Sequence, residues 1–190
     1  CHECAHGYTA YLCGDDTAKR AGRLTLNPLP HIDLFGSILF PLVLIITRSP
    51  FLIGWAKPVP VNPSRLRQPD RHHLYVSLSG IAVNLVLAVC FTVIYGLYGT
   101  YITGSPEGAV GIMLQYGIII NVVLAVFNVL PVPPLDGSWI LYHLLPRDLA
   151  EAYYRLFPYG FVILILLLMT NILHMIMMPI FSFIMSFLDA

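Results

Sequence analysis

The sequence has few charged residues and long stretches without any. Of its 190 residues, 11% are charged, whereas a soluble domain has about 25%. The formal net charge is zero, which argues against a nucleic-acid partner. No charged residue occurs between Arg71 and Glu107, or between Arg155 and Asp189. Each stretch exceeds the roughly 20 apolar residues that a helix needs to cross a bilayer, so the sequence predicts a multi-pass membrane protein.

The sequence also lacks a disulfide pattern and a leading methionine. Its four cysteines do not show the spacing of an extracellular disulfide framework, and Cys13 and Cys90 are typical of buried thiols. The chain opens inside a helix predicted over residues 1–13. We therefore expect a preceding segment that is missing from this sequence.

The apolar stretches predict an all-α helical bundle. We expect transmembrane helices over residues 76–100 and 110–130, and a last span over 159–187 with a possible break near Pro179. Residues 34–48 are apolar but short, and Pro41 interrupts them. This stretch is typical of a re-entrant or surface segment rather than a full span.

The polar stretches between them predict less regular structure. Residues 15–31 read as a loop, because Pro28 and Pro30 are incompatible with a regular helix. Residues 49–73 alternate valine and proline, which indicates extended backbone and a short edge strand. A straight helix over residues 110–146 would exceed about 50 Å at about 1.5 Å per residue, so we expect it to break. The prolines at 131, 133 and 134 supply that break.

The basic residues indicate the orientation in the membrane. Lys and Arg are frequent in residues 15–73 and 147–158, and absent from the loop at 101–109. The positive-inside rule places the two basic regions on the cytoplasmic side. We therefore expect a multi-pass protein of the cell membrane with these two regions on its cytoplasmic side.

Residues 2–6 read His-Glu-Cys-Ala-His and carry the strongest chemical signal. On a helix, His2 and His6 lie one turn apart on one face and can bind one Zn²⁺ together. Glu3 lies about 100° away, where it can reach a metal-bound water and act as a general base. Cys4 points away from the histidines and is expected to pack. Ionisable side chains at membrane depth are costly and usually functional, which favours this interpretation over a chance match.

A catalytic zinc needs a third protein ligand, and Asp136 is the best candidate. It is the only acidic residue between Glu107 and Asp148, and it follows the proline break. A helix cap is the alternative role for it. His6 and Asp136 both lie about 12–16 Å from the nearest basic boundary if the intervening residues are helical, so the two can meet.

The sequences HECAH and FNVLPVPPLDG, with a membrane helix between them, resemble the site-2 protease family. The segments NPLPHID and GWAKPVPVNP resemble its bacterial and archaeal branch. The resemblance covers residues 1–145, which we take as the catalytic core, and residues 146–190 add a loop and a transmembrane helix. It implies that Asp136 is the third zinc ligand and that Asn128 contacts the substrate or the reacting carbonyl. The alternative for Asn128 is interhelical hydrogen bonding.

The resemblance also covers SGIAVN, where Ile81 stands at a position often occupied by proline in the family. A packing role for Gly80 and Asn84 fits this motif. His31 could line the site, although a loop histidine with local hydrogen bonds is the more common case.

These patterns predict a zinc-dependent endopeptidase that cuts transmembrane substrates within the membrane, in regulated intramembrane proteolysis. Its partners would be a transmembrane protein or peptide and the lipid bilayer, and no nucleic acid. The alternative is a catalytically inactive membrane protein of the same fold that binds metal or regulates a partner. An inactive relative would typically have lost Glu3 or a ligand, whereas all four residues are present. The oligomeric state cannot be read from the sequence.

Overall fold

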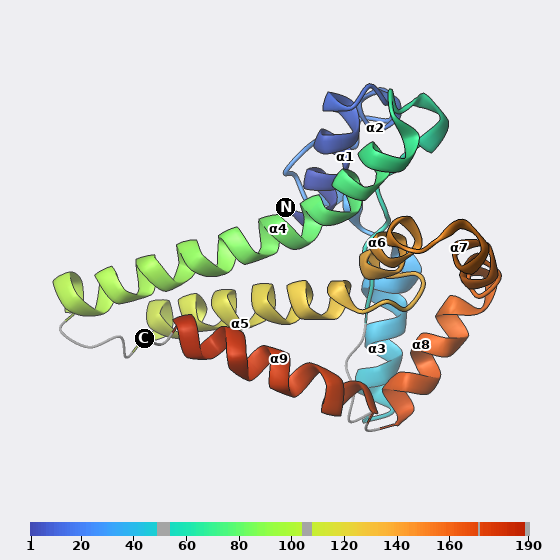
Figure 1. Ribbon diagram of the computed structural model, residues 1–190. Helices are drawn as coiled ribbons and strands as arrows, with labels where there is room; N and C mark the ends of the chain where they lie inside the picture. The colour runs from blue at the N-terminus through green and yellow to red at the C-terminus, as the bar shows by residue number, and fades with distance from the viewer. Residues whose placement is uncertain (49–53, 104–107, 171, 189–190) are drawn as a thin grey trace. The chain divides into compact units, whose positions relative to one another are not determined.

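The computed structural model describes residues 1–48, 54–103, 108–170 and 172–188, and within these ranges the chain forms helices and loops without a β-strand (Figure 1). This confirms the all-α prediction. The chain divides into two compact units: unit 1 contains residues 3–76 with Cys1, and unit 2 contains residues 77–190 with His2. The helices are α1 (His2–Leu12), α2 (Thr17–Arg20), η1 (Leu29–His31), η2 (Leu34–Leu39), α3 (Phe40–Ile46), η3 (Pro63–Arg65), α4 (Pro69–Leu97), η4 (Tyr98–Thr103), α5 (Ala109–Val129), α6 (Asp136–Leu144), α7 (Arg147–Tyr154), η5 (Phe157–Tyr159), α8 (Gly160–Met169) and α9 (Ile172–Leu188).

Unit 1 is built on α1, whose buried side is formed by small residues. Ala10 packs with Leu66 and Val76 in the core of this unit. The region predicted as a plain loop, residues 15–31, contains α2 and the single turn η1. The loop prediction was wrong for α2, because acidic residues precede this helix and Lys19 and Arg20 end it, a charge order that the helix dipole favours.

The apolar stretch at residues 34–46 is helical throughout, as η2 followed by α3. Pro41 does not interrupt it, because it lies in the first turn of α3, where a missing N–H costs no hydrogen bond. Trp55 packs so closely on Gly36 that a Cβ there would overlap the indole ring. Most large side chains of η2 and α3 remain exposed, and the re-entrant assignment stays a prediction.

The predicted edge strand is an extended segment, residues 54–62, with no strand partner in the described part of the chain. Residues 49–53, also covered by that prediction, lie outside the described residues. The strand assignment was wrong because Pro58 and Pro60 remove backbone donors that a ladder of hydrogen bonds requires. The segment passes from Trp55 into η3 and then α4.

Unit 2 consists mainly of long apolar helices. The helix predicted over 76–100 begins earlier, at Pro69, because proline is favoured in a first turn and Asp70 suits the helix N-terminus. Helices α5 and α9 pack together and lie side by side (Figure 1), and the part of α4 in unit 2 contributes Ala88 to their core. Their shared core consists of Ala88, Ile118, Val122 and Val126, with Phe91, Tyr95, Met177, Phe181, Ile184 and Met185 around it.

The predicted helix break is confirmed. Helix α5 ends at Val129 and α6 begins at Asp136, with the proline run between them. The new helix turns back so closely on the end of α5 that a Cβ on Gly137 would overlap the Val129 carbonyl. Only glycine fits this close approach.

The last apolar region is two helices rather than one span. Helix α8 ends at Met169, and Thr170 has extended backbone, while Pro179 lies inside α9. The break is therefore not at Pro179 as the sequence suggested. Thr170 and Asn171, the polar pair within the apolar run, mark its position in the sequence, although Asn171 lies outside the described residues.

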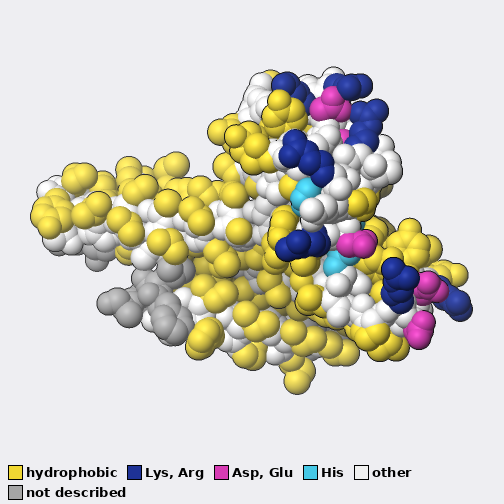
Figure 2. All heavy atoms as spheres, turned by 45° about the horizontal axis from the view of Figure 1, so that its top comes forward, with side chains coloured by type: hydrophobic (Ala, Val, Ile, Leu, Met, Phe, Trp, Pro, Cys, Tyr) yellow, Lys and Arg dark blue, Asp and Glu magenta, His cyan; other side chains and the backbone are white. Residues whose placement is uncertain are grey.

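Three helical stretches among the described residues are long and apolar enough to cross a membrane: Pro69–Ile102, Ala109–Val129 and Arg147–Met169. At most 28% of each apolar window is buried inside the protein. Figure 2 shows hydrophobic side chains covering the surface of these long helices. A surface of this kind is typical of contact with lipid. The middle of the predicted external loop, residues 104–107, lies outside the described residues.

Candidate metal centre

Helix α1 carries both histidines one turn apart, as the sequence predicts. His6 is buried, and its Nδ1 lies 2.7 Å from the carbonyl oxygen of Val76. Because a carbonyl can only accept, Nδ1 donates and the neutral ring carries its lone pair on Nε2. Histidines that bind a metal ion usually donate their other ring N–H to a carbonyl in this way, which orients the ring with Nε2 toward the metal.

Asp136 is the first residue of α6, directly after the helix break. The cap position belongs to Leu135, so the alternative role of Asp136 as the helix cap is not supported. Its Oδ2 lies 3.2 Å from Nε2 of His2. The break therefore brings the carboxylate to the histidine although many residues separate them in the sequence.

Ligand atoms of His2, His6 and Asp136 all lie within 4.8 Å of one another. Nitrogen and oxygen ligands of a tetrahedral zinc, about 2.0–2.1 Å from the ion, are about 3.3 Å apart. The spacing of His2 and Asp136 matches this value. Two imidazoles and one carboxylate are also a donor set known for catalytic zinc, with the fourth position left for water or substrate. The residues present therefore fit a zinc ion.

Asn84 lies against this group, a role that the sequence did not suggest. It is buried in α4, with 2% of its surface exposed, and its amide lies 3.2 Å from Nδ1 of His2. The atom of Asn84 in this contact is Nδ2, a donor. A metal ion on Nε2 of His2 requires the proton on Nδ1, and the amide accepts it only after a half-turn that brings its oxygen to Nδ1. The SGIAVN motif marked Asn84 for helix packing; only the fold shows the histidine beside it.

Glu3 points to the extended segment of unit 1. The backbone N–H of Val59 donates to its Oε2 over 2.8 Å. The contact engages one oxygen of the carboxylate, Oε2. A backbone donor has no sequence signature, so this contact could not be read from the chain.

The other predicted residues lie elsewhere. The Nδ2 of Asn128 donates to Leu124 O in its own helix at 2.9 Å, which is neither of the contacts considered for it. Nε2 of His31 lies 3.0 Å from Thr25 O, as expected for a loop histidine. Cys4 is partly buried and not part of the group around His2.

Comparison with known proteins gives concordant results. The model of peptidase family M50 matches residues 101–169. "Putative zinc metalloprotease YwhC" of Bacillus subtilis (strain 168) is 37% identical over 181 residues, covering 94% of this chain and 79% of the relative. "Putative zinc metalloprotease Rip2" of Mycolicibacterium smegmatis (strain ATCC 700084 / mc(2)155) is 33% identical over 176 residues, covering 91% of this chain and 64% of that relative. No solved structure matches the chain significantly.

Proposed function

The chain belongs to peptidase family M50, the site-2 protease family, and is a zinc metalloprotease; we propose that it hydrolyses peptide bonds of transmembrane substrates within the membrane. The observation that carries this proposal is the meeting of His2 and Asp136 at 3.2 Å, with His6 one helical turn away. We propose these three residues as the zinc ligands. Asp136 follows the apolar helix α5, which is long enough to cross a membrane, and this supports a site at membrane depth.

Zinc supplies Lewis acidity at such a site, because it lowers the pKa of a water molecule and polarises the scissile carbonyl. The remaining steps fall to side chains of the protein. Oε1 of Glu3 takes the proton of the attacking water and passes it to the leaving amine. The hydrogen bond from Val59 to Oε2 holds the carboxylate in one orientation during this transfer.

Asn128 is a further candidate for contact with the reacting carbonyl. One N–H of its amide is used by Leu124 O, and the second N–H of the same group would donate to the developing oxyanion. Its position in the last turn of α5, before the break that precedes Asp136, supports this role.

A substrate helix must unwind before cleavage, because its carbonyls are otherwise engaged in its own hydrogen bonds. The extended segment is a candidate partner by strand addition. However, three of its backbone N–H groups already donate within unit 1. Lys57 donates to the His31 carbonyl, Val59 to the Glu3 carboxylate and Asn62 to the Asp15 carboxylate. Since residues 58 and 60 are prolines, the opposite edge has only carbonyl oxygens there. Pro58 O already accepts from Nη2 of Arg23 at 3.4 Å, so Pro60 O is the candidate acceptor. The pairing would therefore use substrate N–H groups.

We propose that the site faces the cytoplasm in the cell membrane. The support is the concentration of Lys and Arg in residues 15–73 and 147–158, which the positive-inside rule assigns to the cytoplasmic side.

Glu3→Gln tests the mechanism. The amide keeps the size of the side chain but cannot take the proton, so we expect cleavage of casein or a model transmembrane substrate to fall at least about 100-fold. Zinc content, measured by atomic absorption, should stay near that of the unchanged protein. The matched control is Glu151→Gln, because Glu151 is exposed in α7, and it should cleave normally. Cleavage by Glu3→Gln at the unchanged rate would refute the proposed role of Glu3, and loss of zinc would make Glu3 a ligand.

A further inference from the structure

The extended segment of unit 1 is held near both ends by buried charged side chains. At one end Nη2 of Arg23, a residue only 7% exposed, donates to the carbonyl of Lys57 over 2.6 Å. At the other end the backbone N–H of Asn62 donates to Oδ2 of Asp15 over 2.6 Å. Asp15 is fully buried. Burial of a charge is costly without strong hydrogen bonds. We therefore read the hydrogen bonds of both side chains as restraints on the position of this segment.

Between these two points lies the one contact to Glu3. Residues 58 and 60 are prolines, so Val59 is the only residue between Lys57 and Val61 with a backbone N–H to donate. That N–H donates to Oε2 of Glu3 over 2.8 Å. The Val59 side chain is buried and packs on α1, where a Cβ on Gly7 would lie 2.9 Å from its Cγ1. Between Lys57 and Val61 the segment therefore has one backbone donor, and that donor is bonded to Glu3.

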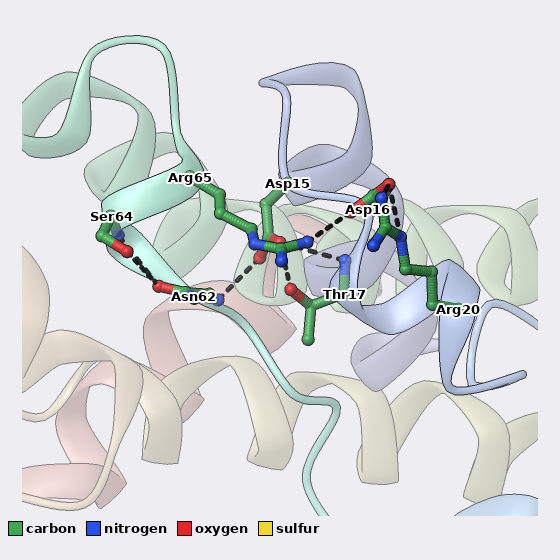
Figure 3. Close-up of polar contacts among 7 residues, drawn as sticks. All are labelled: Asp15, Asp16, Thr17, Arg20, Asn62, Ser64 and Arg65. Carbon is green, nitrogen blue, oxygen red and sulfur yellow. Dashed lines mark hydrogen bonds and ion pairs between the residues drawn. The ribbon is translucent and has the colours of Figure 1, made fainter.

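The carboxylate of Asp15 links two parts of unit 1, as Figure 3 shows. Its Oδ1 accepts from the backbone N–H of Thr17 over 3.0 Å and from the Thr17 hydroxyl. Its Oδ2 accepts from Asn62, far away in the sequence. A residue that only stabilises the start of α2 needs one oxygen. The second oxygen accepts a hydrogen bond from the extended segment.

We propose that Asp15 and Arg23 are positioning residues for the Glu3 carboxylate, and that they act through the backbone N–H of Val59. This inference rests on the proposed role of Glu3 in proton transfer. With both ends of the segment fixed, the Val59 N–H is held on Oε2, and the other oxygen, Oε1, keeps one orientation. A loosened segment lets the carboxylate rotate, and proton transfer slows because it depends on sub-ångström placement.

Asp16 provides a matched comparison beside Asp15. It is about one-third exposed and pairs with Arg20 at 2.7 Å and Arg65 at 2.8 Å (Figure 3). Desolvation opposes ionisation of Asp16, but the two arginines outweigh it and lower its pKa. An exposed pair of this kind contributes little to stability, and neither Asp16 contact reaches the extended segment.

The first test uses Asp15→Asn, Arg23→Lys and the control Asp16→Asn. In Asp15→Asn an NH₂ group replaces one of the two carboxylate oxygens. It then faces a backbone N–H, of Thr17 or Asn62, that needs an acceptor. Hydrogen exchange of the Val59 amide is measured in metal-free protein, which makes it independent of catalysis. We expect exchange to accelerate about five- to tenfold in Asp15→Asn and Arg23→Lys, the equivalent of one lost hydrogen bond. Asp16→Asn should exchange like the unchanged protein. Unaltered Val59 exchange in both folded variants would overturn the proposal.

The second test measures casein cleavage by the zinc-loaded proteins. In the two variants we expect kcat to fall about 10- to 100-fold with KM and zinc content nearly unchanged. Arg23→Lys acts from the other end of the segment, so it tests the proposal if Asp15→Asn fails to fold. Faster Val59 exchange with an unchanged kcat would refute the link to Glu3 while leaving the proposed function intact. An active Glu3→Gln protein would instead refute the proton-transfer role proposed for Glu3 and leave the exchange result standing.

Discussion

At the scale of single residues, the candidate site depends on neighbours that select one nitrogen of each histidine. Val76 O accepts from Nδ1 of His6, and the Asn84 amide lies beside Nδ1 of His2. The first contact leaves the Nε2 lone pair of His6 for a metal ion, and the second does so for His2 once the amide oxygen of Asn84 faces Nδ1. Partners of this kind commonly change metal affinity by about 10- to 100-fold when removed.

Asn84→Ala should therefore weaken zinc binding about 10- to 100-fold, because His2 loses the group that fixes its ring and tautomer. Competition with a chelator of known affinity measures the change. Asn121→Ala is the matched control, since Asn121 is also an amide in an apolar helix but donates to Gly117 O of its own helix at 2.8 Å. Equal zinc affinity in both variants would assign Asn84 to helix packing alone.

A second measurement concerns the ligands themselves. Purified protein should hold about one zinc ion, and Asp136→Ala should hold almost none, because a catalytic site has three protein ligands. Asp148→Ala, which removes an acidic residue from the first turn of α7, is the control and should keep its zinc. Full occupancy in Asp136→Ala would remove Asp136 from the ligand set.

The sequence marked His2, His6 and Asp136 because ionisable groups stand out in an apolar chain, and the structure brings these residues close together. Their role in binding zinc stays a prediction until the measurements above. The supporting contacts were not predictable. Asn84 is one of several amides in apolar helices, and Asp15 lies in a polar loop where a carboxylate is ordinary. Val59 contributes only its backbone, which every non-proline residue has.

At the scale of helices, the break before Asp136 is shaped by the C-terminal part of the chain. The hydroxyl of Tyr153 in α7 donates to Pro131 O at 3.0 Å. The start of α8 packs on Pro133, so that a Cβ on Gly160 would lie 2.5 Å from the Pro133 Cβ. Leu130 and Leu135, on either side of the prolines, share a core with Leu164 and Leu173. The segment after residue 145 thus supports the loop that carries the carboxylate.

Gly160→Ala should destabilise the protein by about 1–3 kcal/mol, because the added methyl has no room against Pro133. Thermal unfolding in detergent, followed by circular dichroism, measures the effect. Gly96→Ala is the control, since nothing lies within 4 Å of a Cβ there, and its higher helix propensity predicts a neutral or stabilising change. A melting temperature for Gly160→Ala at or above that of Gly96→Ala would show that the contact is not tight.

Helix positions could be predicted where a long charge-free run determined them. They were harder to predict where a single residue, such as a proline, determined the end of a helix. The helices near 76–100 and 110–130 were predicted because charge-free runs of that length leave few alternatives. Pro179 was the wrong marker for the last break, because apolar helices tolerate proline when neighbours satisfy the freed carbonyl. The 54–62 segment was taken for a strand because alternation of valine with proline mimics a period of two, although proline removes the donors of a ladder.

At the scale of the whole molecule, α4 allows the membrane orientation to be measured from two positions near the ends of one helix. At 29 residues it extends about 43 Å at about 1.5 Å per residue, enough to cross the bilayer. Asp70 is exposed in its first turn, and Tyr101, 79% exposed, follows its C-terminal end. The two positions therefore report opposite sides of the membrane.

In a protein without its native cysteines, Asp70→Cys should react with an impermeant thiol reagent only from the cytoplasmic side. Tyr101→Cys should react only from outside. The reason is the basic flank of α4 before residue 73 and the absence of Lys and Arg from 101–109. Each variant is the control for the other, measured in intact cells and inverted vesicles. The reverse labelling pattern would invert the proposed orientation.

The placement of the candidate ligands on α1 and α6 has a consequence for biosynthesis. A ribosome makes α1 first, and α6 follows only after α4 and α5 have been translated. A nascent chain that ends before α6 carries the two histidines without the carboxylate, and three ligands are needed for a catalytic zinc. We therefore expect the proposed hydrolytic centre to be completed only after α6 has been translated, and unfinished chains to be inactive toward the other proteins being inserted around them.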